Sequence, residues 1–115
     1  MNRSENLQAR CLKFAKDIIN LIRENKLDIV DSILAKQLVR SATSVGANII
    51  EAQNSFSNKG FVNSYRIALK SSNESIFWLK LLIESNKFRE DNINVLISES
   101  DQLSKIIASI ILKVK

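Results

Sequence analysis

The sequence contains no proline and no histidine, and it has only two glycines and one cysteine among 115 residues. Because it has so few of the residues that form tight turns between strands, long helices are favoured. Without histidine it lacks the commonest general base and the commonest metal ligand, so Ser-His-Asp, Cys-His and HExxH chemistry is excluded. We therefore expect an all-α protein that is not an enzyme and that needs no cofactor or metal.

The single cysteine, Cys11, lies on an apolar helical stripe with Leu7, Phe14 and Ile18 and has no partner for an intrachain disulfide. We interpret it as a core residue in a reducing compartment; a reactive or intermolecular thiol is the alternative. The N-terminal residues lack the apolar stretch of a signal peptide, and the densest apolar run is far shorter than the roughly 20 residues of a membrane span. We expect a cytoplasmic protein with no membrane contact.

Four segments carry apolar residues at spacings of three and four, which is typical of amphipathic helices. Asp28 is the predicted N-cap of the second helix, and Asp91 or Asn92 is the predicted N-cap of the fourth. The first three helices are expected over about residues 4–24, 29–54 and 59–86, and the fourth carries apolar residues from Ile93 to Val114. Links this short predict one domain over 1–115, folded as an antiparallel up-down-up-down four-helix bundle.

The apolar residues exceed what one packing seam needs. They cover wide stripes on the first and fourth helices, and Phe77, Trp78 and Leu81 surround much of the third. Apolar surface of this extent usually marks an interface. We expect a homo-oligomer, with a monomer that has a large core as the alternative.

The second helix is expected to have a polar inner side, because Ser41, Ser44, Asn48 and Glu51 follow the 3, 4, 3 spacing of one helical face. If it pairs antiparallel with the third helix about Ser57, residues whose numbers add to about 114 lie level. The level or nearly level pairs are Arg40 or Ser41 with Glu74, Ser44 with Lys70 or Ser71, Asn48 with Arg66, and Glu51 with Asn63 or Arg66.

We name this predicted set the polar seam; it comprises Arg40, Ser41, Ser44, Asn48, Glu51, Arg66, Ser71 and Glu74. We interpret the seam as a hydrogen-bonded network that fixes helix register, with two opposite-charge matches and with Gly46 allowing close approach of the second and third helices. A polar pocket or an RNA-contacting groove is the alternative. An enzyme that uses Glu51 and Glu74 is a third hypothesis, and it requires an open pocket around both carboxylates.

Lysine and arginine total 17 against 12 aspartates and glutamates, a net charge of +5. On one molecule this is an ordinary soluble surface, but an oligomer multiplies the charge and phosphate contacts then add. RNA or DNA is therefore an expected partner, without sequence reading. A protein partner, such as an enzyme acting on nucleic acid, is the alternative. The candidate phosphate contacts are Lys59, Arg66, Lys70, Lys80, Lys87, Lys113 and Lys115.

Residues 34–52 resemble the hallmark of a bacterial four-helix-bundle family, the proteins encoded in intervening sequences of 23S ribosomal RNA genes, also labelled S23 ribosomal protein. The pattern Gln-Leu-x-Arg-Ser-x-x-Ser-x-x-x-Asn-Ile-x-Glu is met from Gln37 to Glu51. A second element of the family resembles Phe61, residues 65–75 and Trp78-Leu79. Ala52 stands where many relatives have glycine.

The resemblance implies a left-handed antiparallel bundle that assembles as a ring-shaped homopentamer. Relatives include the accessory protein of diversity-generating retroelements, a basic pentamer that binds nucleic acid and a reverse transcriptase. The hallmark residues fall on the polar seam, so the resemblance implies that they are architectural. It further implies a non-enzymatic module associated with nucleic acid.

Overall fold

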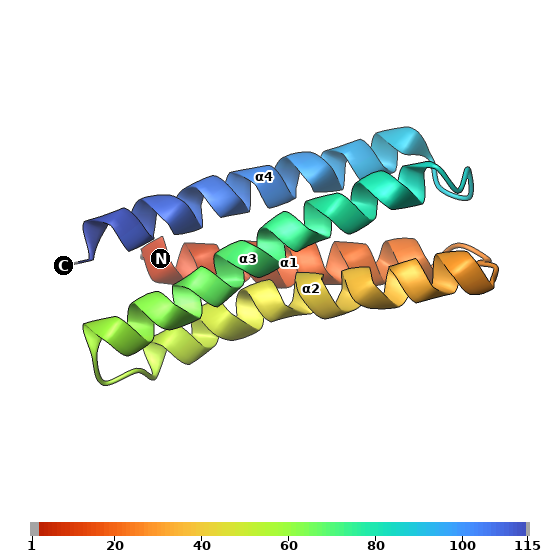
Figure 1. The fold of residues 1–115 in the computed structure, drawn as a ribbon. Coiled ribbons are helices and arrows are strands. Elements are labelled where there is room, and N and C mark those ends of the chain that lie inside the picture. The colour runs from red at the N-terminus through yellow and green to blue at the C-terminus, as the bar shows by residue number, and fades with distance from the viewer. Residues whose placement is uncertain (1–2, 115) are drawn as a thin grey trace.

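The computed structural model describes the backbone of residues 3–114 and the side chains of residues 6–114. Within this part, the chain forms four α-helices and no strand: α1 (Arg3–Arg23), α2 (Ile29–Gln53), α3 (Asn58–Ile83) and α4 (Glu90–Lys113). The helices lie side by side along one long axis, in a body of 45 × 24 × 19 Å (Figure 1). The prediction of an all-α, four-helix fold is confirmed.

Two helices begin at short polar side chains that accept a free backbone N–H. Asp28 is the N-cap of α2, as predicted, and its Oδ1 accepts the N–H of Asp31 at 2.8 Å. Ser57 caps α3, where its Oγ accepts the N–H of Gly60 at 3.0 Å. Each cap satisfies one of the donors that a helix N-terminus leaves without an intrahelical partner.

The link between α3 and α4 differs from the prediction. α3 ends at Ile83 and not at residue 86, and α4 begins at Glu90, with Arg89 as an N-cap that makes no side-chain bond. Asn86 has a φ of 59°, the left-handed region that asparagine tolerates better than most residues, and this stops the helical path. The predicted caps Asp91 and Asn92 lie inside α4. The carboxylates of Glu90 and Asp91 in its first turn interact favourably with the positive end of the helix dipole.

α1 and α3 each pack against α2 and α4, so the four helices surround one core. Hydrogen bonds join Ser41 to Ser75 and Ser44 to Ser71, so residue numbers rise along α2 as they fall along α3. No described helix is long and apolar enough to cross a membrane. The largest fully buried side chains are Leu7, Phe14, Ile18, Leu38, Val45, Ile49, Tyr65, Leu79, Leu82, Ile93, Leu103 and Ile107.

Gly46 allows close approach of α1 and α2, which corrects the expectation that it serves the pair α2 and α3. A Cβ placed on Gly46 would lie 3.1 Å from the Cβ of Cys11 on α1. Carbon atoms at that distance are closer than ordinary van der Waals contact. The lack of a side chain at Gly46 therefore leaves the room that the buried Cys11 side chain occupies.

Large apolar side chains are exposed on the first, third and fourth helices as expected, among them Leu12, Phe77 and Val95, and α2 exposes a further group that was not predicted. The first turns of α2 expose Ile29 by 78%, Val30 by 60% and Ile33 by 58%. These residues adjoin a shallow apolar pocket of about 350 Å³ between α1 and α2, which is lined by Ile22, Leu27, Ser32, Ala35, Lys36 and Val39. We call the three exposed residues and this pocket the α2 apolar patch. Exposed apolar surface thus also occurs on α2, where it was not predicted.

Candidate nucleic-acid interface

The serines of the polar seam meet between α2 and α3. Ser41 Oγ and Ser75 Oγ lie 2.9 Å apart, and Ser71 Oγ donates to Ser44 Oγ at 2.9 Å. Asn48 Nδ2 donates to both the carbonyl and the hydroxyl of Ser44, at 2.9 and 3.0 Å. These side chains bond to one another and to backbone carbonyls, which is what a network that fixes helix register requires.

A second serine cluster, which the sequence analysis missed, joins α3 to α4. Ser72 Oγ donates to the Ser100 carbonyl at 2.8 Å, and Ser100 Oγ donates to the Ser72 carbonyl at 2.7 Å. Ser104 Oγ lies 2.7 Å from Ser72 Oγ and donates to Asn73 Oδ1 at 2.9 Å. The four-residue spacing of Ser100 and Ser104 was the available signal, because it puts two small polar residues on one face of α4.

The predicted opposite-charge matches are wrong. Arg40 is exposed and its guanidinium donates to Gln37 Oε1 of its own helix, while Glu74 is half-buried and forms no ion pair among the described residues. Glu51 and Arg66 are both exposed, and neither forms an ion pair with another described residue. The predicted partners lie near the same level along the bundle axis. However, consecutive residues of a helix point in directions about 100° apart around its axis. Ser41 therefore points inward and Arg40 points to solvent.

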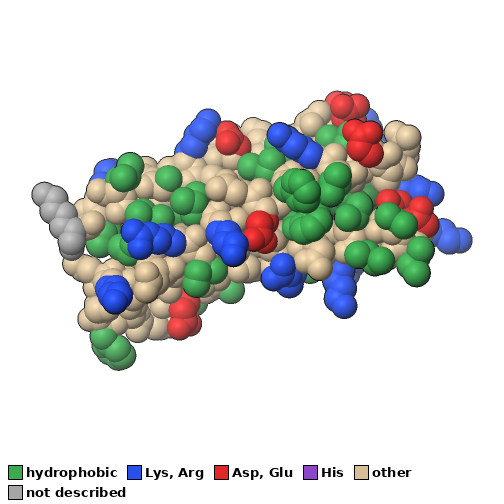
Figure 2. All heavy atoms as spheres, viewed as in Figure 1, with side chains coloured by type: hydrophobic (Ala, Val, Ile, Leu, Met, Phe, Trp, Pro, Cys, Tyr) green, Lys and Arg blue, Asp and Glu red, His purple; other side chains and the backbone are tan. Residues whose placement is uncertain are grey.

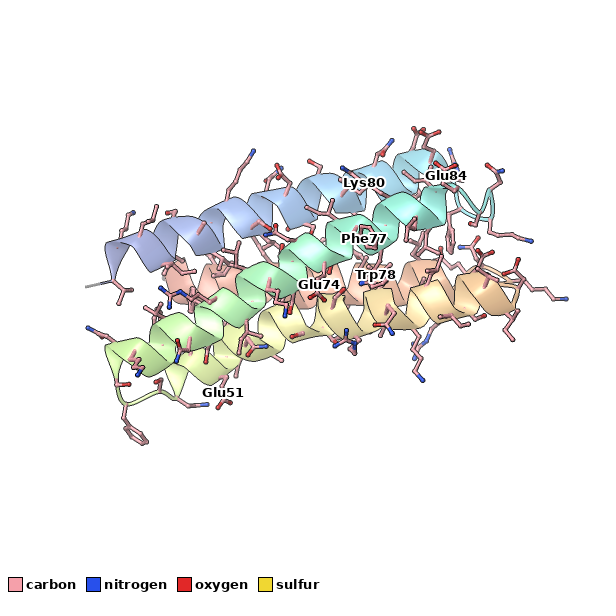
Figure 3. The ribbon with its side chains drawn as sticks, in the orientation of Figure 1. Glu51, Glu74, Phe77, Trp78, Lys80 and Glu84 are labelled. Atoms are coloured by element: carbon pink, nitrogen blue, oxygen red, sulfur yellow. The ribbon has the colours of Figure 1, made fainter. Side chains whose placement is uncertain are left out.

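The Glu51 and Glu74 carboxylates do not converge. Figure 3 shows them at separate places along the bundle. Glu51 is level with residues near 64, so Glu74 lies about 15 Å further along the axis at 1.5 Å per residue. Among the described residues there is no group of three Cys, Asp or Glu side chains that could hold a metal ion. The hypothesis of an enzyme built on these two carboxylates thereby loses its basis.

Three of the predicted phosphate contacts share the outer side of α3. Lys59, Arg66 and Lys70 are exposed, and their spacings of seven and four place them on one helical face. No acidic residue occurs between 59 and 73, and none of the three belongs to an ion pair in the described part of the chain. We call these three residues the α3 basic stripe.

The remaining candidates are dispersed. Lys80 is also exposed, but it lies about 15 Å further along α3 than Lys70. Lys87, in the link between α3 and α4, lies at the opposite end of the bundle from Lys113 in the last turn of α4 (Figure 1). Figure 2 shows basic side chains spread along this face with acidic ones between them. Lys115 lies outside the described residues.

A groove of about 710 Å³ lies between α1 and α4. Phe14, Leu96 and Val95 line it together with polar residues, and Val95 is 68% exposed. At one end Arg10 bridges the helices, with its Nη2 2.6 Å from Glu99 Oε1. This hydrogen bond raises the pKa of Arg10 above its ordinary value. The polar lining consists of Lys13, Asp17, Asp91, Asn94, Ser98, Glu99 and Gln102.

This chain is similar in sequence and fold to one protein family. The family model described as 23S rRNA-intervening sequence protein matches residues 5–109. A crystal structure of a protein of unknown function, from the S23 ribosomal protein family of Bacteroides thetaiotaomicron, is 34% identical and superposes with a TM-score of 0.86. The similarity covers 97% of this chain and 100% of that one. No curated protein matches.

Proposed function

Because this chain belongs to the 23S rRNA-intervening sequence protein family, we propose that it is a non-enzymatic module that binds RNA through the phosphate backbone. The observation that carries the proposal is the α3 basic stripe. Its three cations are exposed, face one way and have no carboxylate within the stripe to neutralise them. Lys59 also lies in the first turn of α3, where the positive end of the helix dipole adds to its attraction for phosphate.

Neutralising the stripe is expected to weaken RNA binding at least tenfold. The variant Lys59→Gln, Arg66→Gln, Lys70→Gln removes three cations, so fewer counterions are released and the slope of log affinity against log salt should fall by about 2 to 3. A fluorescein-labelled RNA hairpin with a single-stranded tail would be titrated at several salt concentrations. The control, Lys105→Gln, removes an exposed lysine that is bridged to Asp101 on α4. Equal affinities of wild type and triple variant, or no binding at low salt, would contradict the proposal.

We also propose that copies of the chain associate. The α2 apolar patch supports this, because three adjacent branched side chains are exposed beside an apolar pocket and lie apart from the basic stripe. The finer features implied by the resemblance, a left-handed antiparallel bundle whose copies close into a five-membered ring, belong to the same proposal. A ring would place several basic stripes on one assembly and would multiply their attraction for RNA.

The variant Ile33→Glu is expected to convert the assembly to single chains without unfolding them. A charge placed in the patch must be desolvated on association, while in the free chain it stays in water. Light scattering should show a particle mass five times the 13.0 kDa of one chain for the wild type, and 13.0 kDa for the variant. Leu112→Glu, the same kind of change at an exposed site on α4, should leave the assembly intact. A wild type of 13.0 kDa would refute self-association.

The groove between α1 and α4 favours a second candidate function, a scaffold that docks a protein partner. Its apolar floor of Phe14 and Leu96 suits the apolar stripe of a partner helix, and Asp91 on its rim forms no ion pair with a described residue. Retention of a partner in a pull-down after nuclease treatment would favour this function. Loss of the partner with the RNA would favour the first.

A further inference from the structure

An exposed aromatic ring continues the basic stripe. Phe77 follows Lys70 by seven residues and Arg66 by eleven, so all three lie on one face of α3. The Phe77 side chain is 57% exposed. Figure 3 shows Phe77 and Trp78 on α3 between Glu74 and Lys80, and Figure 2 shows green side chains gathered over this part of the molecule. Cations and an open ring thus share one line along the helix.

The Phe77 ring is held in place by a neighbour that is itself anchored. The rings of Phe77 and Trp78 meet edge to face, with centroids 5.0 Å apart and planes at 72°. Trp78 is half-buried and packs against the hydrophobic core. A ring that packs edge to face against one fixed neighbour keeps at least one face open, and it loses little conformational entropy when another flat group covers that face.

The length of the line and the position of its charges suit a short single strand. From Lys59 to Phe77 it is about 27 Å long at 1.5 Å per residue, which suits a few nucleotides of an extended strand. The cations Lys59, Arg66 and Lys70 form the first part of the line, and the half-buried Glu74 lies between Lys70 and Phe77. Phosphates are therefore attracted along Lys59, Arg66 and Lys70, whereas the segment around Glu74 and Phe77 suits an uncharged base and not another phosphate.

We propose that Phe77 is a stacking platform for an unpaired base of single-stranded RNA whose phosphates lie along Lys59, Arg66 and Lys70. This inference rests on the proposed RNA binding and adds the class of RNA. Stacking on an aromatic side chain needs a base whose face is uncovered, which single-stranded segments offer and paired helices do not. Because every base has such a face, the platform contributes affinity for single strands without reading their sequence.

The test uses the full chain and two probes, a single-stranded oligoadenylate of about eight nucleotides and an RNA duplex of the same length. Phe77→Leu keeps an apolar side chain but removes the aromatic face. It is expected to weaken oligoadenylate binding about tenfold to hundredfold, with unchanged duplex binding and an unchanged salt slope because no charge is removed. Leu81→Ala, one turn further and 37% exposed, is the matched control and should bind like the wild type.

Trp78 supplies a second readout, because it is the only tryptophan and touches the Phe77 ring. Oligoadenylate should change its fluorescence in the wild type and in Leu81→Ala, and should not do so in Phe77→Leu. Wild-type affinity for oligoadenylate in Phe77→Leu would overturn the platform and leave the proposed RNA binding intact. If the wild type binds neither probe, the proposed function itself fails. Loss of self-association in Phe77→Leu, with RNA binding unchanged, would assign the ring to a contact between copies and would also overturn the platform.

Discussion

Replacing Ser72 by leucine is expected to lower the free energy of unfolding by about 3 kcal/mol or more. Ser72 is fully buried, and it and Ser100 each donate a hydroxyl to the other's carbonyl at 2.8 and 2.7 Å. Such short side chains reach each other's backbone only where α3 and α4 are very close. A leucine would have to push the helices apart and would also remove the bond to Ser100.

Denaturant unfolding measures this change, and two variants separate its causes. Ser72→Ala removes the hydroxyl without adding volume and should cost only about 1 kcal/mol. Ser98→Leu adds the same volume at an exposed position of α4 and should change stability little. A Ser72→Leu protein as stable as Ser72→Ala would show that the contact has room for a larger side chain. In that case the serines would not be what fixes the distance between the helices.

The second large effect is a loss of stability at alkaline pH that originates from Cys11. Burial raises the pKa of the Cys11 thiol from its ordinary 9.0 to about 12, with a smaller contribution from nearby Glu99. Between these values the unfolded chain releases the thiol proton while the folded chain keeps it. The folded state then binds more protons, so the free energy of unfolding falls as pH rises. The full interval corresponds to about 4 kcal/mol, and below pH 9 the thiol makes no pH-dependent contribution.

Comparing wild type with Cys11→Ala isolates this contribution, because the other titrating groups are common to both. The alanine variant lacks the packed sulfur and should be less stable at neutral pH by about 1 to 2 kcal/mol. Its stability should decline less steeply above pH 9, so that the two curves approach and then cross. Parallel curves up to pH 11 would show that the thiol ionises as easily in the folded protein as in the unfolded chain.

The register of α2 and α3 could be predicted because it depends mostly on where the chain turns. A turn centred on Ser57 predicted level pairs near Ser44 with Ser71 and Ser41 with Glu74, and the observed hydrogen bonds join Ser44 to Ser71 and Ser41 to Ser75. Position along a helix advances by a fixed 1.5 Å per residue, so an error of one residue moves a pair only slightly. The start of α2 at Asp28 was equally predictable, since a local side-chain bond defines it.

Direction around the helix axis was harder to predict. Arg40 and Ser41 are consecutive and lie at nearly the same position along α2. Arg40 is nevertheless exposed, whereas Ser41 is buried with only 2% of its surface exposed. Gly46 was assigned to the wrong partner for the same reason, because it faces Cys11 of α1 and not α3. An amphipathic pattern predicts which broad side of a helix faces the core. Which of the other helices a given residue on that side contacts depends on how all four helices pack. The contact of Ser72 with Ser100 and Ser104 was not predicted, because it depends on how α4 packs against α3.

The sequence by itself determined the helices, the cap of α2 at Asp28 and the exclusion of histidine chemistry, because these follow from local spacing and composition. It also contained the family pattern. The tertiary structure decided which charges remain unpaired, that Lys59, Arg66, Lys70 and Phe77 form one exposed line, and that the Glu51 and Glu74 carboxylates stay apart. Exposure and pairing depend on contacts between segments distant in the chain, and those contacts form only when the four helices bury their apolar faces together.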